Sequence, residues 1–204
     1  MCCLLRCRKT IGVKIQSVFT LLIIFLNTMR KLLNEELPRL SIEEFKEEAK
    51  IPLVIVLDNV RSHLNVGSVF RTADGFLIEA IYLCGITGQP PHRDIHKTAL
   101  GATETVAWQY HENTLAAVEK LKAEGYIVLA IEQAENATFL HEFEPEAGAK
   151  YAVVLGNEVD GVAQEVVNTA DEVIEIPQFG MKHSLNIAVT AGIVIWDLFK
   201  KMRL

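Results

Sequence analysis

Cysteine is scarce in the body of this chain. Three of the four cysteines, Cys2, Cys3 and Cys7, lie within the first seven of the 204 residues, and only Cys84 follows them. A single cysteine can form neither a disulfide framework nor a zinc site with several thiolate ligands. We therefore expect a protein of a reducing compartment, the cytoplasm, that binds no metal.

The signatures of the common nucleotide-binding enzymes are also missing. The sequence contains no GxGxxG after a strand pattern, no P-loop, no HExxH and no GxSxG. These absences disfavour a conventional dinucleotide oxidoreductase and a P-loop enzyme. Any cofactor that binds must be held by a different arrangement of loops.

An excess of positive charge is absent as well. The chain has 20 Lys and Arg residues against 26 Asp and Glu residues, a net charge of −6. Four of the basic residues and none of the acidic ones fall in the first 28 positions, so the remainder is more acidic still. Nucleic acid could therefore be bound only through a local basic patch and not through the overall charge.

Residues 1–28 combine basic side chains with a short apolar run, Val18 to Leu26, which imitates the start of a signal peptide. No small-residue cleavage pattern follows, and the run is shorter than the roughly 20 apolar residues that cross a bilayer. We expect this to be a non-native or disordered upstream segment, with Met29 as the natural start and no membrane contact. A functional membrane anchor is the alternative.

Apolar runs rich in β-branched residues alternate with helical patterns along the rest of the chain. The runs predict strands over 53–57, 80–84, 126–130, 152–155 and 173–176, and the helical patterns cover 66–76, 114–124, 162–168 and 185–201. This alternation predicts an α/β domain over 51–204 with a parallel, helix-covered sheet. Residues 29–50 form an N-terminal extension, with helices expected over 29–37 and 42–49.

Unusual residues follow three of the predicted strands, where open α/β sheets bind their ligands. In the first loop, Asn65 precedes Arg71 by six residues. Asn65 has a structural alternative as a helix cap. Arg71 has one too, as a partner in an ion pair, because an arginine among apolar residues usually needs a carboxylate or a phosphate.

The second and third loops carry glycine, acidic and amide residues. In the second, Gly156 and Glu158 follow a buried strand, and glycine there would let a ligand approach the backbone. A plain strand-to-helix turn explains the glycine equally well. In the third, Ser184 and Asn186 open an apolar helix, and capping alone could account for Ser184.

Together the three strings Asn-x5-Arg, Leu-Gly-x-Glu-x-x-Gly and Ile-Pro-x-x-Gly-x-x-x-Ser-Leu-Asn resemble the motifs of the SpoU/TrmH family of RNA ribose 2′-O-methyltransferases in the SPOUT superfamily. The resemblance runs from about Leu53 to Phe199. It implies a SPOUT-type parallel sheet with helices on both faces and a deep C-terminal trefoil knot, an exception to the rule that chains avoid knots.

The same resemblance implies an activity and its residues. The cofactor would be S-adenosyl-L-methionine, contacted by Gly156, Ile176 and Leu185. The methyl group would pass to a ribose 2′-hydroxyl. The residues expected to act in catalysis are Arg71, Asn65, Glu158, Ser184 and Asn186. Because a free arginine keeps its proton at ordinary pH, we expect Arg71 to stabilise developing negative charge instead of acting as a base.

The partners implied are RNA and a second copy of the chain in a homodimer. Within the motif loops the candidates for RNA contact are Arg61, Lys182 and His183. Transfer RNA is the favoured substrate and ribosomal RNA the alternative. A non-catalytic RNA-binding module that kept the fold is the rival interpretation, and the presence of all five expected catalytic side chains argues against it.

Overall fold

The computed structural model describes residues 29–182 and 184–204. The chain divides into two compact units, Met1–Arg39 and Leu40–Leu204. The upstream segment 1–28 and His183 lie outside the described residues, and the predictions made for them stay predictions.

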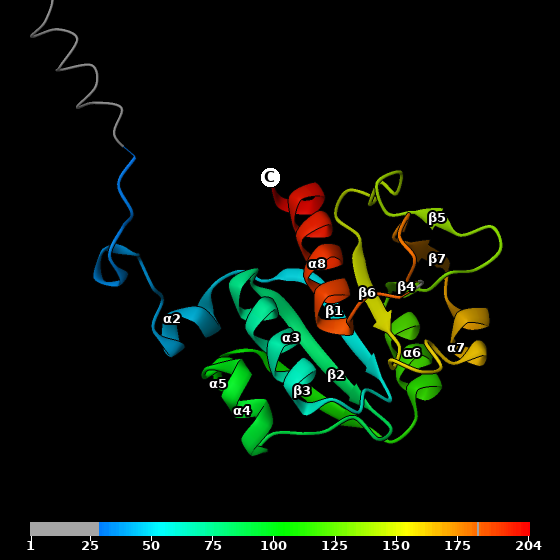
Figure 1. Cartoon of the computed structure of the whole chain (residues 1–204), viewed down its shortest axis with the longest axis horizontal. Coiled ribbons are helices and arrows are strands. Elements are labelled where there is room, and N and C mark those ends of the chain that lie inside the picture. The colour runs from blue at the N-terminus through cyan, green and yellow to red at the C-terminus, as the bar shows by residue number, and fades with distance from the viewer. Residues whose placement is uncertain (1–28, 183) are drawn as a thin grey trace, which may run out of the picture. The chain divides into compact units, whose positions relative to one another are not determined.

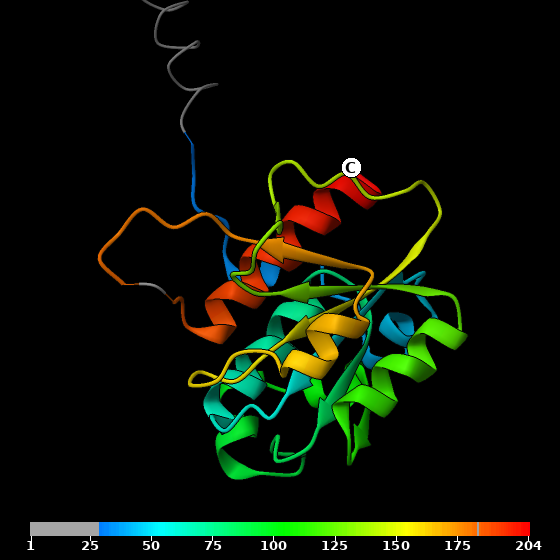
Figure 2. The same ribbon diagram turned by 90° about the vertical axis from the view of Figure 1, so that its right-hand side faces the viewer.

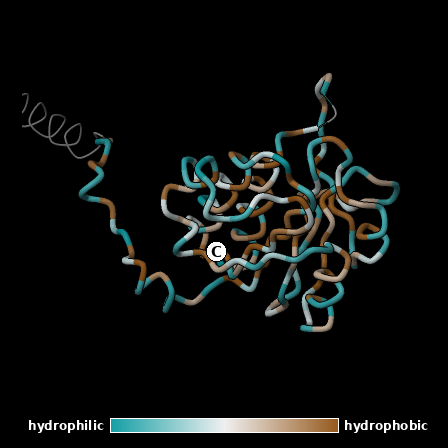
Figure 3. Tube along the Cα trace, turned by 90° about the horizontal axis from the view of Figure 1, so that it is seen from below, coloured by the Kyte–Doolittle hydropathy of each residue, from teal (hydrophilic) through white to brown (hydrophobic). Residues whose placement is uncertain are grey.

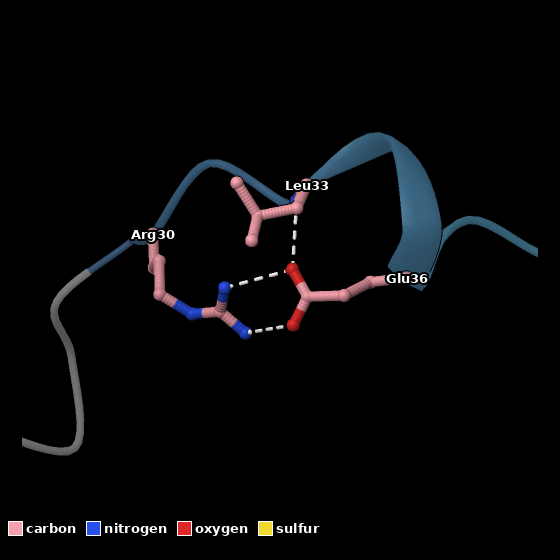
Figure 4. A network of polar contacts seen from close by, with 3 residues as sticks. All are labelled: Arg30, Leu33 and Glu36. Atoms are coloured by element: carbon pink, nitrogen blue, oxygen red, sulfur yellow. Dashed lines mark hydrogen bonds and ion pairs between the residues drawn. The ribbon is translucent and has the colours of Figure 1, made fainter.

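The described part of the first unit contains one short helical turn, η1 (Asn34–Glu36). Figure 4 shows that the Arg30 guanidinium donates two hydrogen bonds, of 2.9 and 2.8 Å, to the Glu36 carboxylate, which also accepts one of 2.7 Å from the Leu33 backbone N–H. The amphipathic helix expected over 29–37 is therefore wrong. Its leucines are exposed, and a short helix without a packed face is marginal in water.

The second unit is built on a seven-stranded sheet with the order β3-β2-β1-β6-β4-β7-β5 (Figure 1). Every neighbouring pair is parallel. The strands are β1 (Ile51–Asp58), β2 (Ile78–Cys84), β3 (Ala107–His111), β4 (Tyr126–Ile131), β5 (Thr138–Phe139), β6 (Lys150–Leu155) and β7 (Glu172–Glu175). The carboxyl ends of β1, β6, β4 and β7 therefore meet along one edge.

Helices cover both faces of this sheet. They are α2 (Ile42–Glu47), α3 (His63–Gly75), α4 (Arg93–Ala99), α5 (Ala102–Thr105), α6 (Thr114–Ala123), α7 (Gln164–Thr169) and α8 (Ile187–Arg203). Alternate residues of β1 belong to two separate cores, with Leu53 on the side of α3 and α8 and Val54 on the side of α6 and α7. Figure 3 shows hydrophobic residues mainly in the interior of this unit and hydrophilic ones mainly at its outside.

The five strands and the α3, α6, α7 and α8 helices predicted from the sequence are confirmed, with small shifts at their ends. The prediction missed β3 and β5 at the edges of the sheet, and the short helices α4 and α5. Edge strand β3 has no fully buried residue, so its hydrophobic signal is weak. The knot concerns how the chain threads through itself, and it stays a prediction.

Candidate functional site

A cavity of about 300 Å³ lies at the carboxyl ends of β4, β6 and β7. The backbone that follows β6 forms one wall, and residues on either side of the β7–α8 loop form another. All three predicted cofactor contacts, Gly156, Ile176 and Leu185, line it. Ser184 and Glu158 belong to its lining as well.

The charged side chains that line this cavity, among the described residues, are all acidic. Three carboxylates, Glu132, Glu158 and Asp160, belong to its lining, and no lysine, arginine or histidine among the described residues does. Such a lining favours a ligand that carries positive charge and repels one that carries phosphate groups. The described residues also contain no cluster of three or more His, Cys, Asp and Glu side chains that could hold a metal ion.

The loop that follows β6 folds back tightly on itself. Asn157 and Gly161 exchange two backbone hydrogen bonds, of 3.2 and 3.1 Å. A Cβ atom on Gly156 would lie 1.9 Å from the carbonyl carbon of Gly161, so any side chain there would force the loop open. The glycine is therefore needed for the turn itself, which was the alternative explanation, although its backbone also borders the cavity.

A hydrogen-bonded chain of side chains joins the three sequence motifs. The Asn65 amide donates to Glu158 Oε1 at 2.8 Å, and Asn65 Oδ1 accepts from the Asn186 amide at 3.3 Å. These residues are 93 and 121 positions apart from Asn65 in sequence. Three of the five residues predicted to act in catalysis thus meet at the rim of the cavity.

The helix caps differ from those considered on the sequence. Ser62, and not Asn65, caps α3, because its hydroxyl accepts from the Asn65 backbone N–H. Asn186 caps α8 by accepting from the Ala188 N–H, and Ser184 lies outside the helix. Capping therefore explains neither Asn65 nor Ser184. The Asn65 side chain is left to bridge Glu158 and Asn186.

Arg71 does not join this group in the single chain. It lies six residues after Asn65 on α3, about 9 Å further along the axis and on a different face. The side chain is exposed, and no carboxylate of the described residues lies within ion-pair distance. The structural ion pair considered for Arg71 is therefore not formed among the described residues.

Two of the three candidates for RNA contact are described, and both Arg61 and Lys182 are exposed. Lys182 follows a segment that extends away from the sheet after β7 (Figure 2). In this segment the Phe179 and Met181 side chains are 97% and 84% exposed. Apolar side chains so open to water usually mark a surface that another molecule covers.

Sequence reasoning missed two carboxylates that fix the loop after β6. Glu132, directly after β4, accepts the Val162 N–H at 3.0 Å. Asp58, the last residue of β1 and 1% exposed, accepts from the Thr114 hydroxyl at 2.6 Å and the Ala163 N–H at 3.1 Å. An acidic residue at the end of a buried strand was the available signal in both cases.

Cys84, which lies near Asp58, is buried. Burial, with a further contribution from the Asp58 charge, raises the pKa of the Cys84 thiol to about 12. The thiol therefore stays protonated at neutral pH and is a poor nucleophile.

Comparison with known proteins gives a consistent set of relatives. A TrmH family tRNA/rRNA methyltransferase, so named, from Staphylococcus saprophyticus is 30% identical over 156 residues, which are 76% of this chain and 61% of that protein. The chain thus spans about three fifths of that curated relative.

Two solved structures are similar over most of the chain. The AdoMet-bound rRNA methyltransferase of Sinorhizobium meliloti is 25% identical with a TM-score of 0.69, over 76% of this chain and 59% of that one. A structure that addresses 2-OH methylation of C/U34 on tRNA is 25% identical with a TM-score of 0.65, over 74% and 97%. The SpoU rRNA Methylase family matches residues 52–196, well over half of the sequence. The chain therefore belongs to the SpoU rRNA methylase family, in the SpoU/TrmH branch of the SPOUT superfamily.

Proposed function

We propose that this protein transfers a methyl group from S-adenosyl-L-methionine to a ribose 2′-hydroxyl of RNA in the cytoplasm. The observation that carries the proposal is the Asn186–Asn65–Glu158 chain at the rim of the cavity, which unites the three motifs. Transfer RNA is the favoured substrate, in line with the neighbour that addresses 2-OH methylation on tRNA. Ribosomal RNA is the alternative, in line with the Sinorhizobium neighbour.

The cavity fits this cofactor better than it fits a phosphate-bearing one. S-adenosyl-L-methionine carries a sulfonium and an ammonium group against one carboxylate, and the lining supplies carboxylates and no cationic side chain among the described residues. Leu155, Ile176 and Leu185 add apolar surface for an adenine ring. When bound, the cofactor supplies an electrophilic methyl group.

The residues around the cavity would orient the ribose and handle its proton. Asn65 holds the Glu158 carboxylate at the rim, and Glu158 is the one carboxylate of the network that can accept the hydroxyl proton. Ser184 would help to fix the ribose. Arg71 would hold an RNA phosphate and stabilise charge on the attacking oxygen. Since it lies away from Asn65 in one chain, we propose that it serves the site of a second copy.

Helix α8 offers the surface for that second copy. Ile187, Val194 and Ile195 are buried in their own chain, so they are core residues. Val189, Ile193 and Trp196 remain exposed and border an apolar hollow of about 610 Å³. We propose a homodimer through this face. Sedimentation at micromolar concentration should give twice the chain mass, and a monomer with full activity would contradict the dimer.

Transfer of tritiated methyl groups from the labelled cofactor to RNA tests the activity. We expect label in transfer RNA transcripts, located at a ribose by nuclease digestion that leaves a 2′-O-methylated dinucleotide. Label in ribosomal RNA alone would favour the alternative substrate. Cofactor and RNA binding without any transfer would instead favour the non-catalytic module.

A further inference from the structure

A second cavity, of about 250 Å³, lies between α4, α5 and the start of β3. It shares no lining residue with the first. Its walls offer flat or rigid faces from Pro90, Pro91, His92, His96 and Trp108, and its polar edge includes the Glu104 carboxylate. Flat aromatic walls with a carboxylate at one edge suit a planar ligand that donates hydrogen bonds.

A pair of stacked imidazoles joins the first turn of α3 to the segment that precedes α4. The rings of His63 and His92 lie 3.8 Å apart at an angle of 11°. His63 opens α3 two residues before Asn65, and His92 lines the second cavity. Gly88 makes room for this stack, because a Cβ there would lie 2.2 Å from the His63 ring. The stack thus links the first turn of α3, which also carries Asn65, to the wall of the second cavity.

Positive charge flanks the cavity on the outer face of α4. Arg93 and Lys97 are one helical turn apart and both exposed, so they share a face next to that of His92 and His96. Neither cation, nor Glu104, lies within 4 Å of an opposite charge on the described residues. Charges without internal partners are available to a ligand.

We propose that this cavity binds an unstacked guanine base of the RNA substrate, next to the nucleotide that is methylated. Single-stranded RNA is commonly recognised by stacking bases on aromatic side chains and by hydrogen bonds to their Watson–Crick edges. Guanine presents two adjacent donors, N1–H and the 2-amino group, which match the two oxygens of Glu104. Adenine, cytosine and uracil each present an acceptor there, which the carboxylate repels. Arg93 and Lys97 hold the neighbouring phosphates.

This inference rests on the proposed RNA substrate, but its first test needs no catalysis. The chain has two tryptophans, Trp108 and Trp196, and a stacked base quenches indole fluorescence. Titrating the full chain with GMP, AMP, CMP and UMP should give quenching by GMP at the lowest concentration. The Trp108→Phe variant, chosen because Trp108 packs partly against the core, should lose that quenching while Trp196 continues to emit.

The Glu104→Gln variant separates guanine recognition from general stacking. We expect its preference for GMP over AMP to fall at least fivefold while stacking persists. Equal quenching by all four nucleotides in the unaltered chain would overturn the choice of guanine. Quenching that survives Trp108→Phe would overturn the site.

A second measurement uses single-stranded RNA decamers that differ by one guanine. Removing the stacking partner should weaken binding of the guanine decamer about fivefold to a hundredfold. Arg93→Gln and Lys97→Gln should each reduce the slope of log affinity against log salt concentration by about one. The reduction should be the same for decamers with and without the guanine. Guanine binding without methyl transfer would reject the proposed activity and support this site. Methyl transfer without guanine preference would support the activity and reject this site.

Discussion

The two loops that border the first cavity are held in opposite ways. The loop after β6 is fastened by its own backbone bridge, by Glu132 at Val162 and by Asp58 at Ala163. The segment after β7 carries Phe179 and Met181 almost fully in water. Among its described residues, only Asn186 at its far end hydrogen-bonds to another motif.

This difference indicates that one half of the site is formed in the single chain and the other half is not. A loop tied by carboxylates to neighbouring strands can hold a small ligand without rearrangement. Exposed apolar side chains gain stability only when another surface covers them. Arg71, exposed and away from Asn65, belongs with the second half. The fastened half and the two ends of the open half line the cofactor cavity, and the exposed middle of the open half suits RNA or a second copy.

The largest effect should come from Arg71→Ala, which tests the open half. We expect turnover to fall about a hundred- to a thousandfold, as when one donor is lost from a site that stabilises developing charge. Melting temperature and cofactor affinity should stay unchanged, because Arg71 has no ion-pair partner among the described residues.

Single-turnover rates, calorimetry and thermal melts on the same Arg71→Ala sample would check this. Mixing it with the Glu158→Gln variant offers a sharper control, since a site shared between copies would regain part of the activity in mixed dimers. Early melting with normal turnover of the folded fraction would mean that Arg71 is structural.

Glu132→Ala should have the next largest effect and tests the fastened half. It removes the acceptor for the Val162 N–H, so the loop at the cavity wall loosens. A hydrogen bond to a charged group contributes about 1.5–3 kcal/mol, so cofactor affinity should fall about ten- to a hundredfold. Glu132→Gln keeps one carbonyl acceptor but not the negative charge, so it should restore part of the affinity.

Calorimetry with S-adenosyl-L-methionine measures both Glu132 variants. Turnover at saturating cofactor should change little for either, which separates a positioning role from a catalytic one. The Gly156→Val variant is a poorer probe, because its side chain would break the Asn157–Gly161 turn whether or not a ligand touches it. Unchanged affinity in Glu132→Ala would show that the loop holds its shape without this bond.

The central strands and long helices could be predicted because burial leaves a strong trace in sequence. β1 and β6 are continuous apolar runs since both faces of the sheet are covered, and such runs are easy to find. Strand β3 is short and its side chains are half or fully exposed, so it lacks the continuous apolar run that marks the central strands. The expected helix over 29–37 failed because its leucines are exposed among the described residues, and a short helix without a packed face is marginal in water.

Some residues of the site could be predicted from the sequence, and others could not. The resemblance of the three motifs to the family predicted that Asn65, Glu158 and Asn186 belong to one site. The structure joins them by hydrogen bonds. Their partners could not be known, because pairings across 93 and 121 residues depend on the sheet order. Glu132 and Asp58 were missed because a single acidic residue at the end of a buried strand is a weak signal until the loop that it fastens is known.

Asp58→Asn should have a smaller effect, on stability. The buried carboxylate accepts from Thr114, Asn59 and Ala163, and asparagine would turn an NH₂ group toward one of these donors. One buried donor left without an acceptor costs about 1–3 kcal/mol of unfolding free energy. Urea unfolding would measure the loss. The control is Asp160→Asn, on the exposed part of the loop after β6. Equal stability of the two variants would mean that water replaces the lost acceptor.

The smallest effect on the isolated chain should come from Phe179→Ser, and this variant most directly tests the open half. A side chain that is 97% exposed makes few contacts, so the free energy of unfolding should change by no more than about 0.5 kcal/mol. If RNA or a second copy covers this segment, removing the ring should still weaken one association. Fluorescence anisotropy with transfer RNA and sedimentation of the same variant tell the two apart. Val159→Ser, on an exposed apolar residue of the loop after β6, is the matched control.

A loss of RNA affinity without a change in mass would assign the segment to the substrate, and dissociation of the dimer would assign it to the partner copy. Unchanged RNA binding and unchanged mass would contradict the distinction between the two loops, because neither RNA nor a second copy would then cover the exposed Phe179 ring.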